Sequence, residues 1–171
     1  MANYPNTIYS PRTKANRSGV VYDATKQTVI FAEDIQKLDA EVVALETDLE
    51  ARKYSITFII DGGGSAITTG QKGHLEIPFK CEIERVTLLA DVSGSIVIDI
   101  WNDTYANFPP TDADSITAAA PPTLSTAQKS QDATLTDWLK TIDAGDILAF
   151  NVDSAATVTR VTLALKVKKI D

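Results

Sequence analysis

The chain of 171 residues has one cysteine and one histidine, and aromatic residues make up only 7% of it. A single cysteine, Cys81, excludes an internal disulfide framework and a zinc site built from cysteines. No apolar run reaches the roughly 18 residues that a membrane span requires, and the N-terminus lacks the apolar stretch of a signal peptide. We therefore expect a soluble protein with no membrane insertion and no cleaved leader.

Basic residues are outnumbered, with 16 Lys and Arg against 23 Asp and Glu, which gives a net charge of −7. This sign argues against a nucleic-acid partner, because phosphate recognition requires a basic surface. The charge is unevenly distributed: residues 1–30 are net basic, residues 31–50 are strongly acidic and residues 54–171 are mildly acidic. The distribution predicts three segments with different roles.

Residues 1–30 show neither helical nor strand periodicity, and Pro5, Pro11 and Gly19 interrupt them. They hold more apolar and basic side chains than a linker needs. We predict an extended arm that becomes ordered on an acidic partner surface; the alternative is a flexible terminus without a partner. The predicted docking residues are Tyr4, Ile8, Tyr9, Arg12, Lys14, Arg17 and Tyr22.

The segment 31–53 has the apolar spacing of a helix with a coiled-coil seam. The predicted oligomerisation residues are Phe31, Ile35, Leu38, Val42, Leu45 and Leu49. The flanking e and g positions are acidic except for Ala32, so parallel helices would repel one another there. Association is therefore marginal unless an attached domain contributes to it. The alternative is a helix that packs on the chain's own globular domain.

From residue 54 onward the apolar residues alternate with a period of two, which predicts strands near 56–60, 75–79, 86–88, 96–101, 147–152 and 161–167. Turn signals, such as those at 61–64 and 91–94, separate them. Pro78 places its strand at a sheet edge or a bulge. We therefore predict a mainly β fold, in which the arm and one short helix precede an antiparallel, jelly-roll-like β-sandwich over residues 54–171.

The stretch between Trp101 and Asp143 is less regular than the rest of this domain. We place short strands near 115–117 and 134–142, although the apolar residues of the latter segment also fit one face of a helix, so both interpretations stay open. Trp101 and Trp138 are expected to fill the core, since large aromatic side chains dominate small β-sandwiches.

Two groups of residues resemble structural proteins of tailed bacteriophages. Residues 19–35 (GVVYDATKQTVIFAEDI) resemble segments that join a virion-binding arm to a projecting part. Residues 89–103 (LADVSGSIVIDIWND), 107–111 (NFPPT) and 144–153 (AGDILAFNVD) look like a β-sandwich domain that recurs in phage virion proteins.

This resemblance implies a homotrimeric virion protein of the head-fibre, capsid-decoration or short-tail-fibre type, assembled in the host cytoplasm. The arm would then bind a capsid or tail protein. Ile and Val at a with Leu at d favour a parallel dimer when taken alone. We nevertheless expect a trimer, because the seam is short and acidic and the β-domain contacts should decide the copy number.

The sequence offers little for catalysis. His74 is the only histidine and has no nucleophile motif near it, so it is expected at the rim of the domain. We expect no enzyme activity, no cofactor and no metal. A calcium site is the alternative to ordinary turn chemistry for the loop aspartates, which are Asp91, Asp99, Asp103, Asp112 and Asp114.

Tyr105 and Phe108 are candidate glycan contacts, because sugars stack on exposed aromatic rings. They support an alternative function as a receptor- or glycan-binding module of a tail fibre, with a host surface glycan as partner.

Overall fold

A computed structural model of the protein describes residues 32–50 and 52–170, without the side chains of residues 32–35 and 50. The chain divides into two compact units, Met1–Glu50 and Ala51–Asp171. The predicted arm over residues 1–30 lies outside the described residues.

The first unit contains the helix α1 (Ala32–Glu50), which lies within the segment where the heptad pattern predicts a helix. Its sequence contains neither glycine nor proline and is rich in Ala, Leu and Glu, which favour helices. No helix among the described residues has both the length and the hydropathy of a membrane span.

The second unit is a single antiparallel sheet of seven strands in the order β1-β7-β3-β6-β2, with β4 and β5 also paired to β3. The strands are β1 (Lys53–Asp61), β2 (Gly70–Glu76), β3 (Cys81–Thr104), β4 (Thr123–Asp132), β5 (Thr141–Ile142), β6 (Asp146–Ala156) and β7 (Arg160–Lys169). Two short 3-10 helices, η1 (Tyr105–Asn107) and η2 (Asp112–Asp114), lie between β3 and β4. The prediction of a mainly β fold with one N-terminal helix is confirmed.

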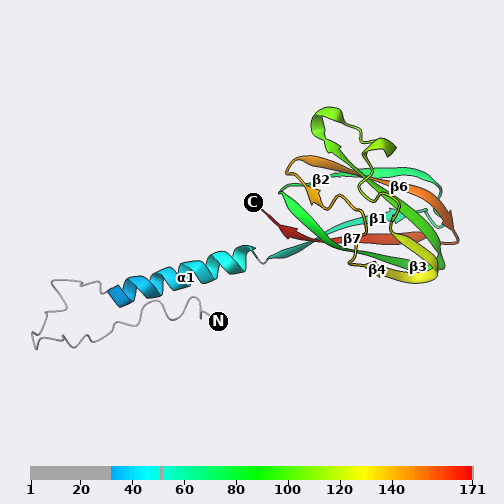
Figure 1. The fold of residues 1–171 in the computed structure, drawn as a ribbon. Coiled ribbons are helices and arrows are strands. Elements are labelled where there is room, and N and C mark those ends of the chain that lie inside the picture. The colour runs from blue at the N-terminus through cyan, green and yellow to red at the C-terminus, as the bar shows by residue number, and fades with distance from the viewer. Residues whose placement is uncertain (1–31, 51, 171) are drawn as a thin grey trace, which may run out of the picture. The chain divides into compact units, whose positions relative to one another are not determined.

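The 24-residue strand β3 organises this sheet, because its two halves have different partners. Residues 81–90 pair with β7, and residues 95–104 pair with β6. We call β1, β7 and residues 81–90 the first half-sheet, and β2, β6 and residues 95–104 the second half-sheet. The curled sheet encloses one core to which both halves contribute (Figure 1), including Ile83, Val86, Leu88, Ile96, Ile98, Ile100, Phe150, Leu163 and Leu165.

The turn predicted at 91–94 is wrong, because β3 passes through these residues without a break. The Asp91 carboxylate instead accepts hydrogen bonds from the backbone N–H of Arg160 at 3.0 Å and from the Thr159 hydroxyl. Gly94 permits close approach of the strands: a Cβ there would lie 2.7 Å from the Ala156 carbonyl oxygen. These turn-type residues mark the place where the sheet bends.

The strand β4 is a second correction, because it occupies residues predicted to be irregular. The strands predicted at 115–117 and 134–142 are reduced to a single bridge between Ser115 and Trp101 and to the two-residue β5. Leu124 is the one large apolar side chain in β4, so alternation could not reveal it. Pairing with β3 holds the strand in place.

The two tryptophans differ from each other. Trp138 lies in the core as predicted, with 6% of its surface exposed. Trp101 follows the buried Ile100 on β3 and points to the outer side of the sheet, where its Nε1 donates to Asp99 at 2.7 Å. β2 ends at Glu76, before Pro78, and is an edge of the sheet.

Candidate functional site

The predicted seam of α1 is exposed wherever its side chains are described. Leu38, Val42, Leu45 and Leu49 have exposed fractions of 58%, 45%, 51% and 51%. Their spacing of four, three and four residues places them along one stripe of the helix. Phe31 and the side chain of Ile35 lie outside the described residues. The described part of the seam is therefore an apolar surface that the single chain leaves in contact with water.

The seam has acidic flanks. Asp39, Glu41, Glu46 and Asp48 lie beside it, and Lys37 is the one basic residue in the sequence of α1. The last turn of the helix contains no basic residue that would favour its negative end. If copies associated through this seam, these carboxylates would repel one another.

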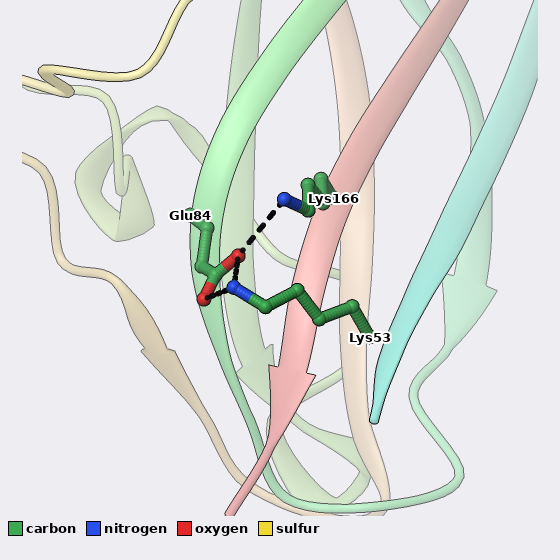
Figure 2. Close-up of polar contacts among 3 residues, drawn as sticks. All are labelled: Lys53, Glu84 and Lys166. Carbon is green, nitrogen blue, oxygen red and sulfur yellow. Dashed lines mark hydrogen bonds and ion pairs between the residues drawn. The ribbon is translucent and has the colours of Figure 1, made fainter. Parts of the chain in front are cut away.

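In the first half-sheet, an acidic residue occupies a β-bulge. The register of β3 against β7 shifts between Ile83 and Arg85, which leaves Glu84 as the extra residue. Its carboxylate contacts the Nζ of Lys53 from β1 at 2.5 Å and that of Lys166 from β7 at 3.4 Å (Figure 2). The hydrogen bond from Lys53, followed by that from Lys166, lowers the pKa of Glu84. Lysines from β1 and β7 thus neutralise the carboxylate at this bulge.

The second half-sheet also has an acidic residue at a bulge, with a different environment. The register of β3 against β6 shifts between Val97 and Ile98, which leaves Asp153 of β6 without a partner residue on β3. Partial burial is the main cause that raises the pKa of Asp153, and the nearby charges of Asp99 and Asp112 raise it further. The Asn151 amide donates to its carboxylate at 2.7 Å and opposes this shift.

Asp99 anchors the long connection between β3 and β4. Only 7% of its surface is exposed. Its carboxylate accepts hydrogen bonds from the Trp101 indole and the Ile100 backbone N–H, both at 2.7 Å. The Ser115 hydroxyl donates to it at 2.8 Å, and the Thr117 hydroxyl donates as well. These bonds compensate the buried charge and hold residues 115–117 against the sheet.

Asp103 and Asp114 form hydrogen bonds with residues close to them in the sequence. Asp103 accepts hydrogen bonds from the Thr104 N–H and the Asn107 amide, and Asp114 accepts from the Thr111 N–H and hydroxyl. The described residues contain no group of three or more His, Cys, Asp or Glu side chains that could hold a metal ion.

The candidate glycan contacts lie in the loop that Asp99 anchors. Tyr105 and Phe108 have exposed fractions of 78% and 51%. The ring of His74, from the edge strand β2, stands edge-on to Phe108 with ring centroids 4.8 Å apart. The position of His74 at the rim of the domain agrees with its exposure, but nothing in the sequence indicates its contact with Phe108.

Comparison with known proteins identifies no family. No family model and no curated protein matches the chain. One solved structure with weak similarity is titled "Structure of infectious bursal disease virus Gx strain". The match has 15% identity and a TM-score of 0.19, and it covers 71% of this chain but only 35% of that one. At this TM-score the likeness carries no argument about function.

Proposed function

We propose that this chain is a non-enzymatic structural protein of a bacteriophage particle. Its N-terminal arm anchors it to a capsid or tail protein, the seam of α1 joins three copies, and the β domain projects as a knob. The exposed seam is the observation that carries this proposal. Burying a leucine or valine side chain contributes roughly 1.5–3 kcal/mol, which a single chain forgoes on α1.

A trimer suits the attachment role, because three arms bind together. Once one arm is bound, the others are held at high effective concentration, so a weak arm suffices for firm anchoring. The basic arm also suits an acidic recipient surface. The phage assignment itself rests on the resemblance of residues 19–35 and of the β-domain segments to tailed-phage structural proteins.

The non-enzymatic role is supported by the surroundings of the two residues best suited to nucleophilic or base catalysis. Cys81 is fully buried, and burial raises the pKa of its thiol to about 11, which keeps it protonated and unreactive at neutral pH. His74 contacts an exposed aromatic ring. Measured hydrolysis or lysis of host surface polymer by the purified chain would contradict this part of the proposal.

Oligomerisation through the seam can be tested on the full chain. We expect that the double variant Leu38→Asp/Leu45→Asp is monomeric by native mass spectrometry, whereas the wild type forms trimers. Val43→Asp is the matched control, since Val43 is 59% exposed and lies off the seam. A wild-type chain that stays monomeric at all concentrations, or a double variant that still forms trimers, would contradict the proposal.

Attachment to the particle requires a separate experiment. Immunogold labelling with antibodies against the β domain should mark phage particles that carry the wild-type gene. Deletion of residues 1–30 should leave a folded protein that no longer joins particles. Retained incorporation after this deletion would refute the role of the arm.

A glycan-binding role of the β domain is the second candidate, and the exposure of Tyr105 and Phe108 favours it. Their loop is held by the Asp99 hydrogen bonds, so the rings are presented from a fixed base. Binding of the full chain to a glycan array, lost in Tyr105→Ser/Phe108→Ser, would support this role. Unchanged binding in that variant would exclude these rings as the contact.

A further inference from the structure

The outer faces of the two half-sheets differ in charge. On the first half-sheet and the adjoining parts of β3 and β4, bases outnumber acids: the bases are Lys53, Arg85, Lys129, Arg160, Lys166 and Lys168, and the acids are Asp61, Glu82, Glu84 and Asp91. The carboxylate of Glu84 forms ion pairs with two of these lysines, Lys53 and Lys166. We call this surface the basic face.

The basic face also has an apolar row. Ile59 on β1 and Leu89 on β3 flank Thr162 of β7 in register, and their exposed fractions are 58% and 50%. The next row consists of Thr57, Ala164 and Thr87, which are small and uncharged. A sheet surface with apolar, small and basic rows is suited to packing against another protein surface that is acidic.

The second half-sheet has the opposite charge. Within 70–76, 95–122 and 146–156, Lys72 is the one Lys or Arg in the sequence, and its Nζ donates to Thr68 and Thr69. The acids exposed or partly exposed on its outer side and on the loop that covers it are Glu76, Asp103, Asp112, Asp114 and Asp153, whereas Asp99 is buried. We call this surface the acidic face; the pKa of Asp153 within it is raised mainly by partial burial and further by the charges of Asp99 and Asp112.

The connection between the two units keeps the β domains of associated copies near each other. α1 ends at Glu50 and β1 begins at Lys53. Only three Cα–Cα steps join them, which together span at most about 11 Å. If the seams of several copies associate, their β domains are held at high effective concentration. Contacts between these domains would then supply the association energy that the acidic flanks of α1 oppose.

We propose that, in the assembled protein, the basic face of one copy's β domain binds the acidic face of the next copy. This inference rests on the proposed homo-oligomer. A two-fold contact made by either face alone would place like charges together, whereas head-to-tail contacts place opposite charges together. Head-to-tail contacts close into a ring when their rotation permits, and a ring of three copies is compatible with a parallel helical seam.

The inference can be tested by reversing charge on each face of the full chain. Lys129→Glu/Lys168→Glu changes the basic face, and Asp112→Lys/Asp153→Lys changes the acidic face. Each double variant should raise the dissociation constant of the oligomer by about tenfold or more in sedimentation equilibrium at low ionic strength. The four-fold variant, which carries both pairs of substitutions, again has one face of each charge, so it should restore the dissociation constant toward the wild-type value; it is the decisive sample.

The control adds negative charge outside both faces. Ser65→Glu/Ala66→Glu lies in the connection between β1 and β2 and should leave the dissociation constant unchanged. The neutral double variant Lys129→Gln/Lys168→Gln replaces the charge-reversed variant if the latter fails to fold. It should weaken association, but less than charge reversal does.

The outcomes separate this inference from the proposed function. Restored association in the four-fold variant supports face-to-face binding. An oligomeric chain that is insensitive to every reversal, or a four-fold variant no better than the double variants, overturns the inference and leaves the seam in place. A wild-type chain that is monomeric at all concentrations overturns the proposed homo-oligomer and the inference with it.

Discussion

Glu84 and Asp153 occupy equivalent positions, each as the extra residue of a bulge in the same curled sheet, but their surroundings differ. Glu84 lies between two lysines, which lower its pKa. The pKa of Asp153 is raised, mainly by partial burial and further by the nearby charges of Asp99 and Asp112. One half of the sheet therefore compensates its bulge carboxylate within the chain, and the other half concentrates negative charge.

This difference shows that the charge of the domain is arranged by half-sheet. The net charge of −7 conceals it, because bases of the first half-sheet and acids of the second cancel in the sum. Because acidic residues are crowded on one face, that face is stabilised by any positively charged surface that approaches it.

The largest effect is expected in the second half-sheet, at Asp99. Asp99→Ala would leave the Trp101 indole and the Ser115 and Thr117 hydroxyls without their acceptor. We expect the free energy of unfolding to fall by about 3 kcal/mol, because buried donors lose their partners. Urea denaturation followed by tryptophan fluorescence measures this change.

Asp103→Ala is the matched control for this prediction, since Asp103 is more exposed and accepts hydrogen bonds only from the nearby Thr104 and Asn107. It should lower stability by less than about 1 kcal/mol. If Asp99→Ala and Asp103→Ala were equally mild, Asp99 would not be the anchor of the loop.

A smaller effect is expected in the first half-sheet. Glu84→Gln removes the anion between Lys53 and Lys166, whose side chains are 45% and 37% exposed. Solvent screening limits the loss of stability at neutral pH to about 0.5 kcal/mol. Because the pKa of Glu84 is lowered in the folded state, the wild-type advantage should disappear as the pH falls below the ordinary value of 4.5. Glu82→Gln, on the same strand, serves as the control in pH-dependent denaturation.

The smallest effect should have the opposite sign. The pKa of Asp153 is raised, so its ionised form is disfavoured in the folded state, and Asp153→Asn should increase stability at neutral pH by about 0.3 kcal/mol. This gain should shrink as the pH falls through the pKa of the folded state, because the wild-type carboxyl then becomes neutral too. Thermal unfolding at several pH values measures the gain and its pH dependence; a loss of stability at neutral pH would show that the folded state does not disfavour the ionised carboxylate.

The sequence predicts the fold class well because the core follows simple alternation. Ile96, Ile98 and Ile100 are buried on one side of β3, as their spacing indicates. It does not predict β4, because Leu124 is the one large apolar side chain of that strand, so no alternation marks it, and pairing with β3 is not visible in the sequence. The bend at Asp91 and Gly94 was mistaken for a turn, since the same residue types favour both.

The candidate site was only partly accessible to sequence analysis. The heptad spacing identified the seam residues that the structure places on an exposed stripe of α1. The exposure of Tyr105 and Phe108 also matches their expected place in a loop. The two charged faces could not be predicted, because they depend on which strands pair and on the bulges at Glu84 and Asp153. The predicted docking role of the arm residues and the predicted seam role of Phe31 and Ile35 stay predictions, because these residues or their side chains lie outside the part of the chain that the structure describes.

The central claim is that the basic face is covered by another copy, and thiol accessibility tests it most directly. Ile59→Cys places a reactive thiol on that face, while the native Cys81 is buried and its pKa of about 11 keeps it unreactive. In the full-chain oligomer, maleimide should modify residue 59 severalfold more slowly than in the same variant carrying Leu38→Asp/Leu45→Asp. Ala66→Cys, outside both faces, should react equally in both. Equal rates at residue 59 in a chain of oligomeric mass would contradict the account.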